Sequence, residues 1–235
     1  MSGLESIAEN VAEVRGRMTA AAARSRRPVE AVRLVAVTKY VGLDEIRALV
    51  AAGCTDLGES RPQQFWERAA ELRDLPVRWH IIGHIQRNKV ERTVPLVAMV
   101  HSLDSLRLAE AIDAAAGKLQ RKVSVLLEVN TSREPAKHGF VPEEIEPLLP
   151  QLTGLKHIDI CGLMCMAGLE GGDDEARHEF ADLRTLRDRL QTNCPVTVRL
   201  DELSMGMSGD YEIAIEEGAT IVRVGSALFE RAEAH

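Results

Sequence analysis

The sequence predicts an α/β protein, specifically a (β/α)8 barrel with one extra N-terminal helix. Short apolar runs rich in β-branched residues alternate with helical stretches, and this alternation requires a parallel sheet. From residue 33 onward the strand-then-helix unit repeats eight times in about 200 residues, which is the size of a compact barrel. An open doubly wound sheet is the alternative, but no Gly-x-Gly-x-x-Gly segment opens a helix after the first strand.

The chain begins with the extra helix, which we place within residues 1–27. Its apolar residues recur at intervals of three and four from Leu4 to Met18, and an arginine-rich turn and Pro28 end it. Residues 33–39 follow as the first strand. Four consecutive apolar residues in this segment are typical of a strand that is buried on both faces.

The other elements follow the same alternation. Further strands are predicted at residues 55–58, 79–82, 98–101, 123–129, 157–163, 197–203 and 220–224. Helices are predicted at residues 43–50 and 62–72, around Lys89, at residues 105–117 and 142–152, along the stripe from Phe180 to Leu190, at residues 210–218, and finally through Glu230. We expect residues 1–235 to form one domain.

Composition restricts the classes of partner. The chain has 235 residues, of which 45% are hydrophobic and 28% charged, with a net charge of −7. This acidic balance argues against nucleic-acid and anionic-membrane partners. No apolar run is long enough to span a membrane, and the first residues lack a secretory signal, so we expect a cytoplasmic protein.

Cysteines and histidines do not indicate a metal centre. Cys161 and Cys165 have a C-x3-C spacing, and His80 and His84 an H-x3-H spacing. A zinc site requires a third and a fourth ligand at suitable spacing, and neither pair supplies them. Four cysteines in a chain of this length do not indicate a disulfide framework either. We therefore predict no metal ligands.

Polar or sulfur-containing residues, and in one case a Gly-Ser pair, follow nearly every predicted strand. They are Lys39, Glu59, Ser60, His84, Ser102, Asp104, Asn130, Met164, Met166, Ser204, Gly225 and Ser226. Any one of them could be a loop residue or a helix cap. Because the carboxyl ends of barrel strands form the face that carries active sites, their repeated occurrence predicts a functional site there.

The loops after the last two strands have the features of a phosphate site. Residues 203–210 contain glycines that allow backbone N–H groups to approach a ligand, and a helix follows. Gly225 and Ser226 repeat this arrangement after the eighth strand. Barrels often bind phosphate between these two loops. The alternative is that Ser208 or Asp210 only caps the helix.

The positions of two basic residues, Lys39 and Arg223, each allow more than one role. Lys39, at a strand end, is either a solvated surface lysine or a partly buried nucleophilic amine. Arg223 shares a strand face with Ile221, so we expect it to point into the barrel. There it pairs with a buried carboxylate or donates to a ring nitrogen of a cofactor.

Together, the lysine, the arginine and the phosphate loops describe a site for pyridoxal 5'-phosphate. The aldehyde would form a Schiff base with Lys39, and the phosphate would lie between the loops at 204–208 and 225–226. The pyridine nitrogen would face Arg223.

At the level of motifs, the chain also resembles a known family, the pyridoxal phosphate homeostasis proteins, which are single-domain relatives of the alanine racemase barrel. The resemblance rests on segments at residues 36–39, 58–60, 79–89, 128–130, 137–140, 162–164, 203–208 and 222–226. It implies a Schiff base at Lys39, a nitrogen contact from Arg223 and phosphate contacts from Ser204, Gly225 and Ser226, with Met207 nearby. We add Ser60, His84 and Met164 as candidate cofactor-binding residues. The resemblance further implies a cofactor carrier without an established reaction, and hence no catalytic residue.

The sequence departs from the family pattern at three places. Relatives commonly have Asn at the position of Ser60, Lys-Pro at Val41-Gly42, and Gly-Thr at Gly225-Ser226. The first change puts in doubt an amide contact to the cofactor ring. The last keeps the hydroxyl group.

Several observations favour a carrier over an enzyme. Racemisation needs two opposed bases, and racemases resembling this barrel take a tyrosine from a second domain, for which the sequence to His235 leaves no room. Tyr40 directly follows Lys39 and in a strand would face away from it. A cation at Arg223 also weakens the ring as an electron sink.

We therefore expect a monomer that holds pyridoxal phosphate and passes it to pyridoxal-phosphate-dependent apoenzymes. A slow amino-acid racemase, with Cys165 as a candidate base, is the alternative. A barrel for another phosphorylated metabolite is a third.

Overall fold

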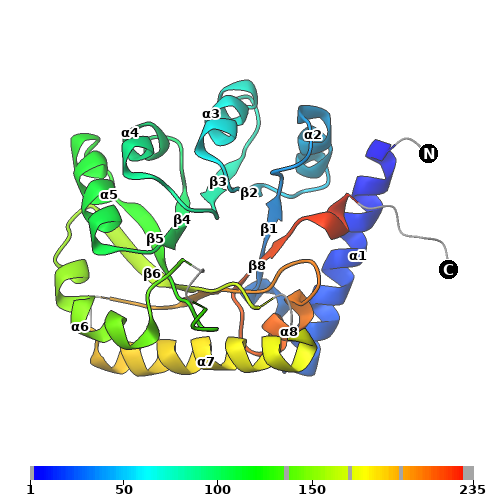
Figure 1. The fold of residues 1–235 in the computed structure, drawn as a ribbon. Helices are drawn as coiled ribbons and strands as arrows, with labels where there is room; N and C mark the ends of the chain where they lie inside the picture. Colours follow the sequence, from blue (N-terminus) through cyan, green and yellow to red (C-terminus); the bar gives the residue numbers. More distant parts are fainter. Residues whose placement is uncertain (1–2, 135–137, 169–170, 196–197, 230–235) are drawn as a thin grey trace.

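The computed structural model describes residues 3–134, 138–168, 171–195 and 198–229. Eight parallel strands close into a barrel in sequence order, and helices surround it (Figure 1). The strands are β1 (Arg33–Val37), β2 (Asp56–Glu59), β3 (Arg78–Ile81), β4 (Met99–Leu103), β5 (Val123–Glu128), β6 (Ile158–Met164), β7 (Glu202–Ser204) and β8 (Ile221–Val224). The predicted (β/α)8 barrel is confirmed.

The helices follow the strands as the alternation predicts. They are α1 (Gly3–Arg24), α2 (Leu43–Ala51), α3 (Pro62–Glu71), α4 (Val90–Thr93), α5 (Leu106–Lys118), α6 (Pro142–Thr153), α7 (Gly172–Asn193) and α8 (Tyr211–Glu216). Short 3-10 helices, η1 (Val29–Ala31), η2 (Arg87–Lys89) and η3 (Ser226–Leu228), complete the set. The extra N-terminal helix is α1. It buries Ile7, Val11, Val14 and Met18, and it packs mainly against α8 and α2.

Strand side chains alternate between two layers. Val222 and Val224 of β8 belong to the large apolar cluster between strands and helices. Inside the barrel a much smaller apolar cluster contains Val35, Met99, Leu126, Met164 and Ile221. The barrel interior is therefore only partly apolar, and buried polar groups occupy the remaining space.

The seventh strand was predicted at residues 197–203, and its start was wrong. The described part of this segment does not pair as a strand before Glu202, and Thr197 lies outside the described residues. Instead, the Gln191 side chain of α7 donates to Val198 O at 2.9 Å and accepts from Leu200 N at 2.6 Å. These bonds satisfy the backbone groups that a sheet ladder would otherwise use.

Two other element ends differ from the prediction. β1 ends at Val37, because Lys39 and Tyr40 form a turn in which Val41 N donates to Thr38 O at 3.1 Å. After β8 the chain forms η3 at the place of the predicted last helix, and Glu230 lies outside the described residues.

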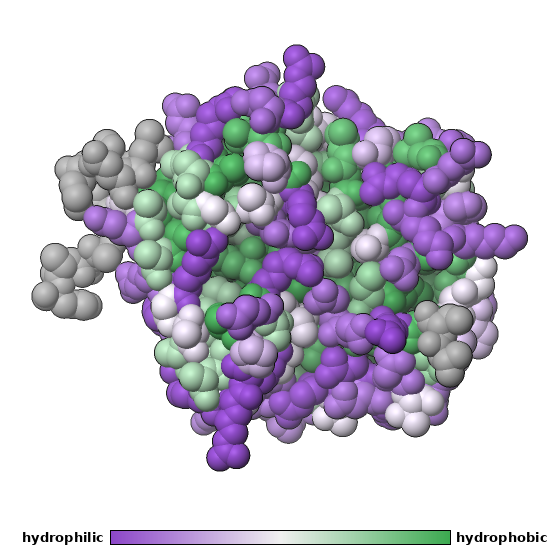
Figure 2. Space-filling view, turned by 180° about the vertical axis from the view of Figure 1, so that it is seen from behind, coloured by the Kyte–Doolittle hydropathy of each residue, from purple (hydrophilic) through white to green (hydrophobic). Residues whose placement is uncertain are grey.

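The surface contains both hydrophilic and hydrophobic areas. Hydrophilic residues cover most of the face seen in Figure 2, with smaller hydrophobic patches between them. Within the described ranges, no helix is both long and apolar enough to cross a membrane.

Candidate functional site

A pocket of about 710 Å³ lies at the carboxyl ends of the strands. Its walls come from the loops after six of the eight strands, and its volume is in the range of small-molecule sites. The lining residues are Val37, Lys39, Tyr40, Val41, Ser60, Ile82, Gly83, Met166, Met207, Ser208, Gly209, Arg223, Gly225, Ser226 and Phe229. The structure thus brings together six of the nine predicted cofactor-binding residues: Lys39, Ser60, Met207, Arg223, Gly225 and Ser226.

A buried charged network fixes the turn that carries Lys39. Glu59 of β2 accepts hydrogen bonds from Thr38 Oγ1, at 2.5 Å, and from Arg68 of α3. The same guanidinium donates to the carbonyl oxygens of Thr38 and Val41, on either side of the lysine turn. Burial raises the pKa of Glu59 despite these hydrogen bonds. The network holds the backbone on both sides of Lys39 against α3.

Lys39 itself is half-buried, with its Nζ 4.9 Å from the centre of the Tyr40 ring. This contact is a cation–π interaction. The expectation that Tyr40 faces away from Lys39 was therefore wrong. Strand alternation does not extend to these residues because β1 ends at Val37. Tyr40 lines the pocket and is 82% exposed.

The loops after β2 and β3 touch each other beside the pocket. A Cβ atom on Gly83 would lie 2.5 Å from Ser60 O, so only glycine allows this approach. Ser102 Oγ donates to Gly83 O at 2.6 Å and fixes the loop from the β4 side. Ser60 is consequently held at the pocket wall.

Arg223 is buried inside the barrel, as the alternation predicted. Its Nη1 donates to Ser204 Oγ at 2.7 Å and its Nη2 to Cys165 O at 2.9 Å. Among the described residues no carboxylate forms an ion pair with it, although Asp210 and Glu128 are near enough to favour its charge electrostatically. Burial lowers its pKa. Because a guanidinium has five N–H donors, Arg223 keeps donors for a ligand in the pocket that it lines.

Ser208 joins the two loops that were predicted to bind phosphate. Its Oγ accepts from Gly225 N at 3.0 Å and from Ala227 N at 3.5 Å. Its own hydroxyl hydrogen is therefore available to a ligand. At Gly206 the backbone takes a φ of +90°, and a Cβ there would lie 2.5 Å from Ala214 Cβ, so this tight turn requires glycine.

Three predicted residues do not line this pocket. Ser204 is fully buried, and its hydroxyl group is hydrogen-bonded to Arg223 and to His101. Met164 belongs to the apolar cluster inside the barrel. His84 is exposed, with its Nδ1 2.7 Å from Asp104 Oδ2. The pocket instead contains Ser208, which the sequence presented as a possible helix cap, and Met166, which follows the same strand as Met164.

His84 belongs to a polar cluster at the same end of the barrel. Its ring stacks on His138 with centroids 4.6 Å apart and planes 16° apart. His84, Asp104 and His138 place three potential metal-ligand atoms within 4.8 Å of one another. Ring-nitrogen lone pairs lie in the ring planes, so in two stacked rings they run nearly parallel instead of converging on one ion. We derive no metal site from this cluster.

Glu128, at the end of β5, is near this cluster and is buried. Burial and the negative charge of Asp104 raise its pKa to about 7, while Arg223 and His84 act in the opposite direction. Its Oε2 atom has no hydrogen-bond partner within the described part of the chain. Glu128 lies in segment 128–130, one of those that carry the family resemblance, but the sequence analysis assigned it no role in the site.

Comparison with known proteins identifies the family. Residues 4–232 match the family model described as alanine racemase, N-terminal domain. The chain is 38% identical over 221 residues to the pyridoxal phosphate homeostasis protein of Aquifex aeolicus, covering 94% of this chain and 96% of that protein. It is 42% identical over 214 residues to the protein of that name from Deinococcus radiodurans, covering 89% and 94%.

Solved structures agree. PipY of Synechococcus elongatus with pyridoxal phosphate bound superposes with a TM-score of 0.84 at 39% identity, covering 95% of this chain and all of that one. An unknown protein from Bifidobacterium adolescentis gives a TM-score of 0.90 at 36% identity, covering 97% and 96%. Alanine racemase of Clostridium difficile, at 17% identity and a TM-score of 0.72, shares the fold over 58% of its length and 96% of this chain. The chain therefore belongs to the pyridoxal phosphate homeostasis protein family.

Proposed function

We propose that this protein binds pyridoxal 5'-phosphate in the pocket at the carboxyl ends of the strands, holds it on Lys39 and passes it to pyridoxal-phosphate-dependent apoenzymes. One observation carries the proposal. The Lys39 amine, the buried Arg223 guanidinium and the Ser208 and Ser226 hydroxyls line a single pocket. The bound pyridoxal phosphate in PipY supports the assignment of the ligand.

The residues present fit the chemistry of this cofactor. When bound, pyridoxal phosphate supplies a reactive aldehyde, and the amine of Lys39 is the group in the pocket that can condense with it and release water. Ser208 and Ser226 offer hydroxyl donors to a phosphate, and Ser208 Oγ accepts from Gly225 N, which ties its loop to the loop that carries Ser226. Ser204 was predicted to contact phosphate, but its hydroxyl already serves Arg223 and His101, so we propose Ser208 in its place. Arg223 can direct a spare N–H donor at the pyridine nitrogen.

We propose a carrier and not an enzyme. Racemisation needs a second base across the substrate from the lysine. Tyr40 lies against the Lys39 ammonium itself, and Tyr211 is buried below Arg17 and does not line the pocket. Cys165 is fully buried, and burial raises the pKa of its thiol to about 12, so the thiol stays protonated near pH 7 and cannot accept a proton. A slow racemase stays the alternative, with Tyr40 as the group that would support it.

A spectral titration with pyridoxal phosphate tests the proposal. We expect the wild type to develop the visible band of a Schiff base at one equivalent and Lys39→Ala to lack it. Lys89→Ala is a matched control, because Lys89 also lies over an aromatic ring, with its Nζ 5.7 Å from the Trp66 centroid, and should keep the band. An equal band in Lys39→Ala would contradict the proposal.

A transfer assay separates carrier from enzyme. The loaded protein should activate a pyridoxal-phosphate-dependent apoenzyme while leaving L-alanine and other free amino acids unracemised. Steady turnover above about 1 per second, in the ordinary range of enzymes, would favour the racemase.

A further inference from the structure

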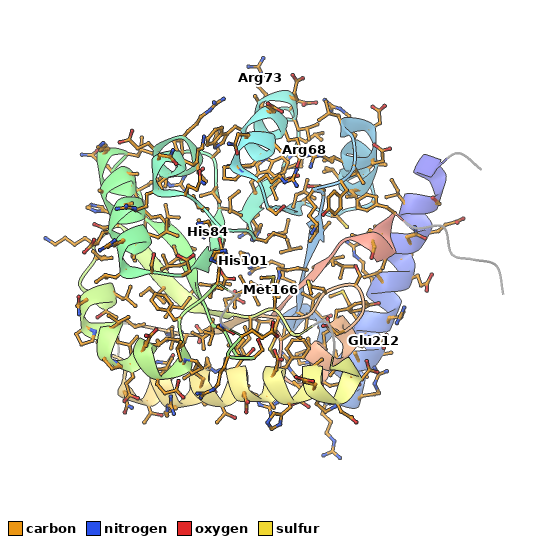
Figure 3. All side chains as sticks on the ribbon, in the orientation of Figure 1. Arg68, Arg73, His84, His101, Met166 and Glu212 are labelled. Atoms are coloured by element: carbon orange, nitrogen blue, oxygen red, sulfur yellow. The ribbon has the colours of Figure 1, made fainter. Side chains whose placement is uncertain are left out.

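A continuous chain of hydrogen bonds runs through the barrel interior to Arg223. Arg223 Nη1 donates to Ser204 Oγ at 2.7 Å, and Ser204 Oγ lies 2.8 Å from His101 Nδ1. His101 Nε2 lies 2.9 Å from His80 Nδ1, and His80 Nε2 lies 2.9 Å from Asp56 Oδ1. Figure 3 labels His101 at the centre of the ring of strands. The four bonds connect residues of β2, β3, β4, β7 and β8.

The two ends of this hydrogen-bond chain line different cavities. Arg223 lines the pocket at the carboxyl ends of the strands. Asp56 is the first residue of β2, and it lines a cavity of about 320 Å³ at the opposite end of the barrel. The three groups between them are fully buried. The hydrogen-bond chain thus links the Arg223 cation at the ligand pocket to the Asp56 carboxylate at the other barrel end, and the groups between them are neutral.

The charges at the two ends fix the direction of every hydrogen bond. An ionised Asp56 can only accept, so His80 carries its hydrogen on Nε2 and accepts at Nδ1. His101 then donates from Nε2 and accepts at Nδ1. The Ser204 hydroxyl therefore donates to His101 and presents a lone pair to Arg223.

The electrostatics agree with this direction. Burial lowers the pKa of both His80 and His101, so both rings are neutral near pH 7. Burial raises the pKa of Asp56, whereas the hydrogen bond from His80 and the positive charges of Arg78 and Arg33 lower it, and the net shift of the pKa is downward. The reverse direction would require a protonated Asp56.

We propose that Asp56, His80 and His101 are positioning residues that set the Ser204 hydroxyl and thereby hold the Arg223 guanidinium in the orientation that binds the cofactor ring. The inference deepens the proposed function and rests on it for the role of Arg223. The physical basis is that a buried guanidinium without a carboxylate partner keeps its geometry only if its acceptors are themselves oriented. Asp56 supplies the orienting charge from the far end of the barrel.

The first test uses the unliganded protein and does not depend on cofactor binding. Nitrogen-15 NMR of the histidine rings distinguishes the two neutral tautomers and the charged form. We expect the Nε2–H tautomer for both His80 and His101 at pH 7. A charged ring or an Nδ1–H tautomer at either residue would overturn the proposed direction of these hydrogen bonds, which we call the relay.

The second test measures pyridoxal phosphate affinity in Asp56→Asn. Asparagine keeps the size of the side chain but removes the charge, and it can present either an acceptor or a donor to His80. The donor and acceptor roles along the hydrogen bonds from residue 56 to Arg223 are then no longer fixed. We expect a weaker affinity by about twofold to tenfold, the range of one ordinary hydrogen bond, with a shift of the bound-cofactor spectrum.

Asp113→Asn is the matched control. Asp113 also bonds a histidine residue, accepting from His157 N at 2.6 Å, but this pair does not lead to the pocket. We expect it to leave affinity and spectrum unchanged. Equal affinity and spectrum in wild type and Asp56→Asn would overturn the relay, and so would a loss of thermal stability without any change in affinity or spectrum. A wild type that binds no cofactor would instead refute the proposed function, while the NMR result would still decide the tautomers.

Discussion

Replacing Glu128 with glutamine should stabilise the protein at neutral pH. The gain in free energy of unfolding over the wild type should be largest near neutral pH and should shrink as the pH falls. Glu128 is 4% exposed and its Oε2 has no partner in the described structure. Burial, together with the charge of Asp104, raises its pKa from 4.5 to about 7. Glutamine has the same shape and no charge to desolvate, so the variant removes this effect and little else.

The sign and size of the effect follow from proton linkage. Below pH 4.5 the glutamic acid is protonated in both the folded and the unfolded state, and it adds no pH dependence. Between pH 4.5 and about 7 the folded state keeps a proton that the unfolded state has released, so the free energy of unfolding falls as pH rises. Above pH 7 the ionised group costs the fold about 3 kcal/mol.

Urea unfolding from pH 4.5 to pH 8, followed by fluorescence of the buried Trp66 and Trp79, measures this effect. The difference in free energy of unfolding between Glu128→Gln and the wild type should grow by about 3 kcal/mol across this range. Titrating groups that do not interact with Glu128 cancel in that difference. In an Asp104→Asn background the difference should be smaller and should level off at a lower pH, because the substitution removes a charge that raises the folded-state pKa of Glu128. A difference that stays constant with pH would refute the reasoning.

Three further substitutions test the pocket and the packing of the barrel. Arg68→Met leaves Glu59 buried without its cation and should destabilise the protein by about 3 kcal/mol in urea unfolding, whereas an unchanged midpoint would count against the network. Gly162→Ala would place a Cβ atom 1.8 Å from Glu202 O in the neighbouring strand and should cost more than about 3 kcal/mol, measured as a lower unfolding midpoint. Ser208→Ala should weaken pyridoxal phosphate binding about tenfold in equilibrium dialysis without changing thermal stability by more than a few degrees, and an unchanged affinity would remove Ser208 from the phosphate site.

The sequence was sufficient for the barrel and for six of the nine candidate residues, which the structure brings to one pocket at the strand ends. Apolar runs and helical periodicities are local signals, and closure into a barrel follows from their number. The same alternation placed Arg223 inside the barrel, where the structure has it. Applied to β3 and β4, it would also have pointed His80 and His101 inward, because His80 alternates with Trp79 and Ile81 and His101 with Val100, which face the helices.

The choice between Ser204 and Ser208 could not be made from the sequence. Ser204 ends β7 and Ser208 lies in the loop that follows, and which one faces the pocket depends on the turn at Gly206, where φ is +90°. Similarly, the orientation of Tyr40 depends on where β1 ends. That end is set by Arg68, a residue of α3 that is distant in sequence. These features depend on tertiary contacts, which periodicity does not encode.

The most direct test of the central claim is to locate the bound cofactor on the chain. The protein, loaded with one equivalent of pyridoxal phosphate, is reduced with borohydride, digested and mapped by mass spectrometry. We predict a single stoichiometric adduct on the peptide that contains Lys39, absent from Lys39→Ala and retained in Lys89→Ala. An adduct spread over surface lysines, or one that persists in Lys39→Ala at the same stoichiometry, would contradict the assignment of this pocket as the cofactor site.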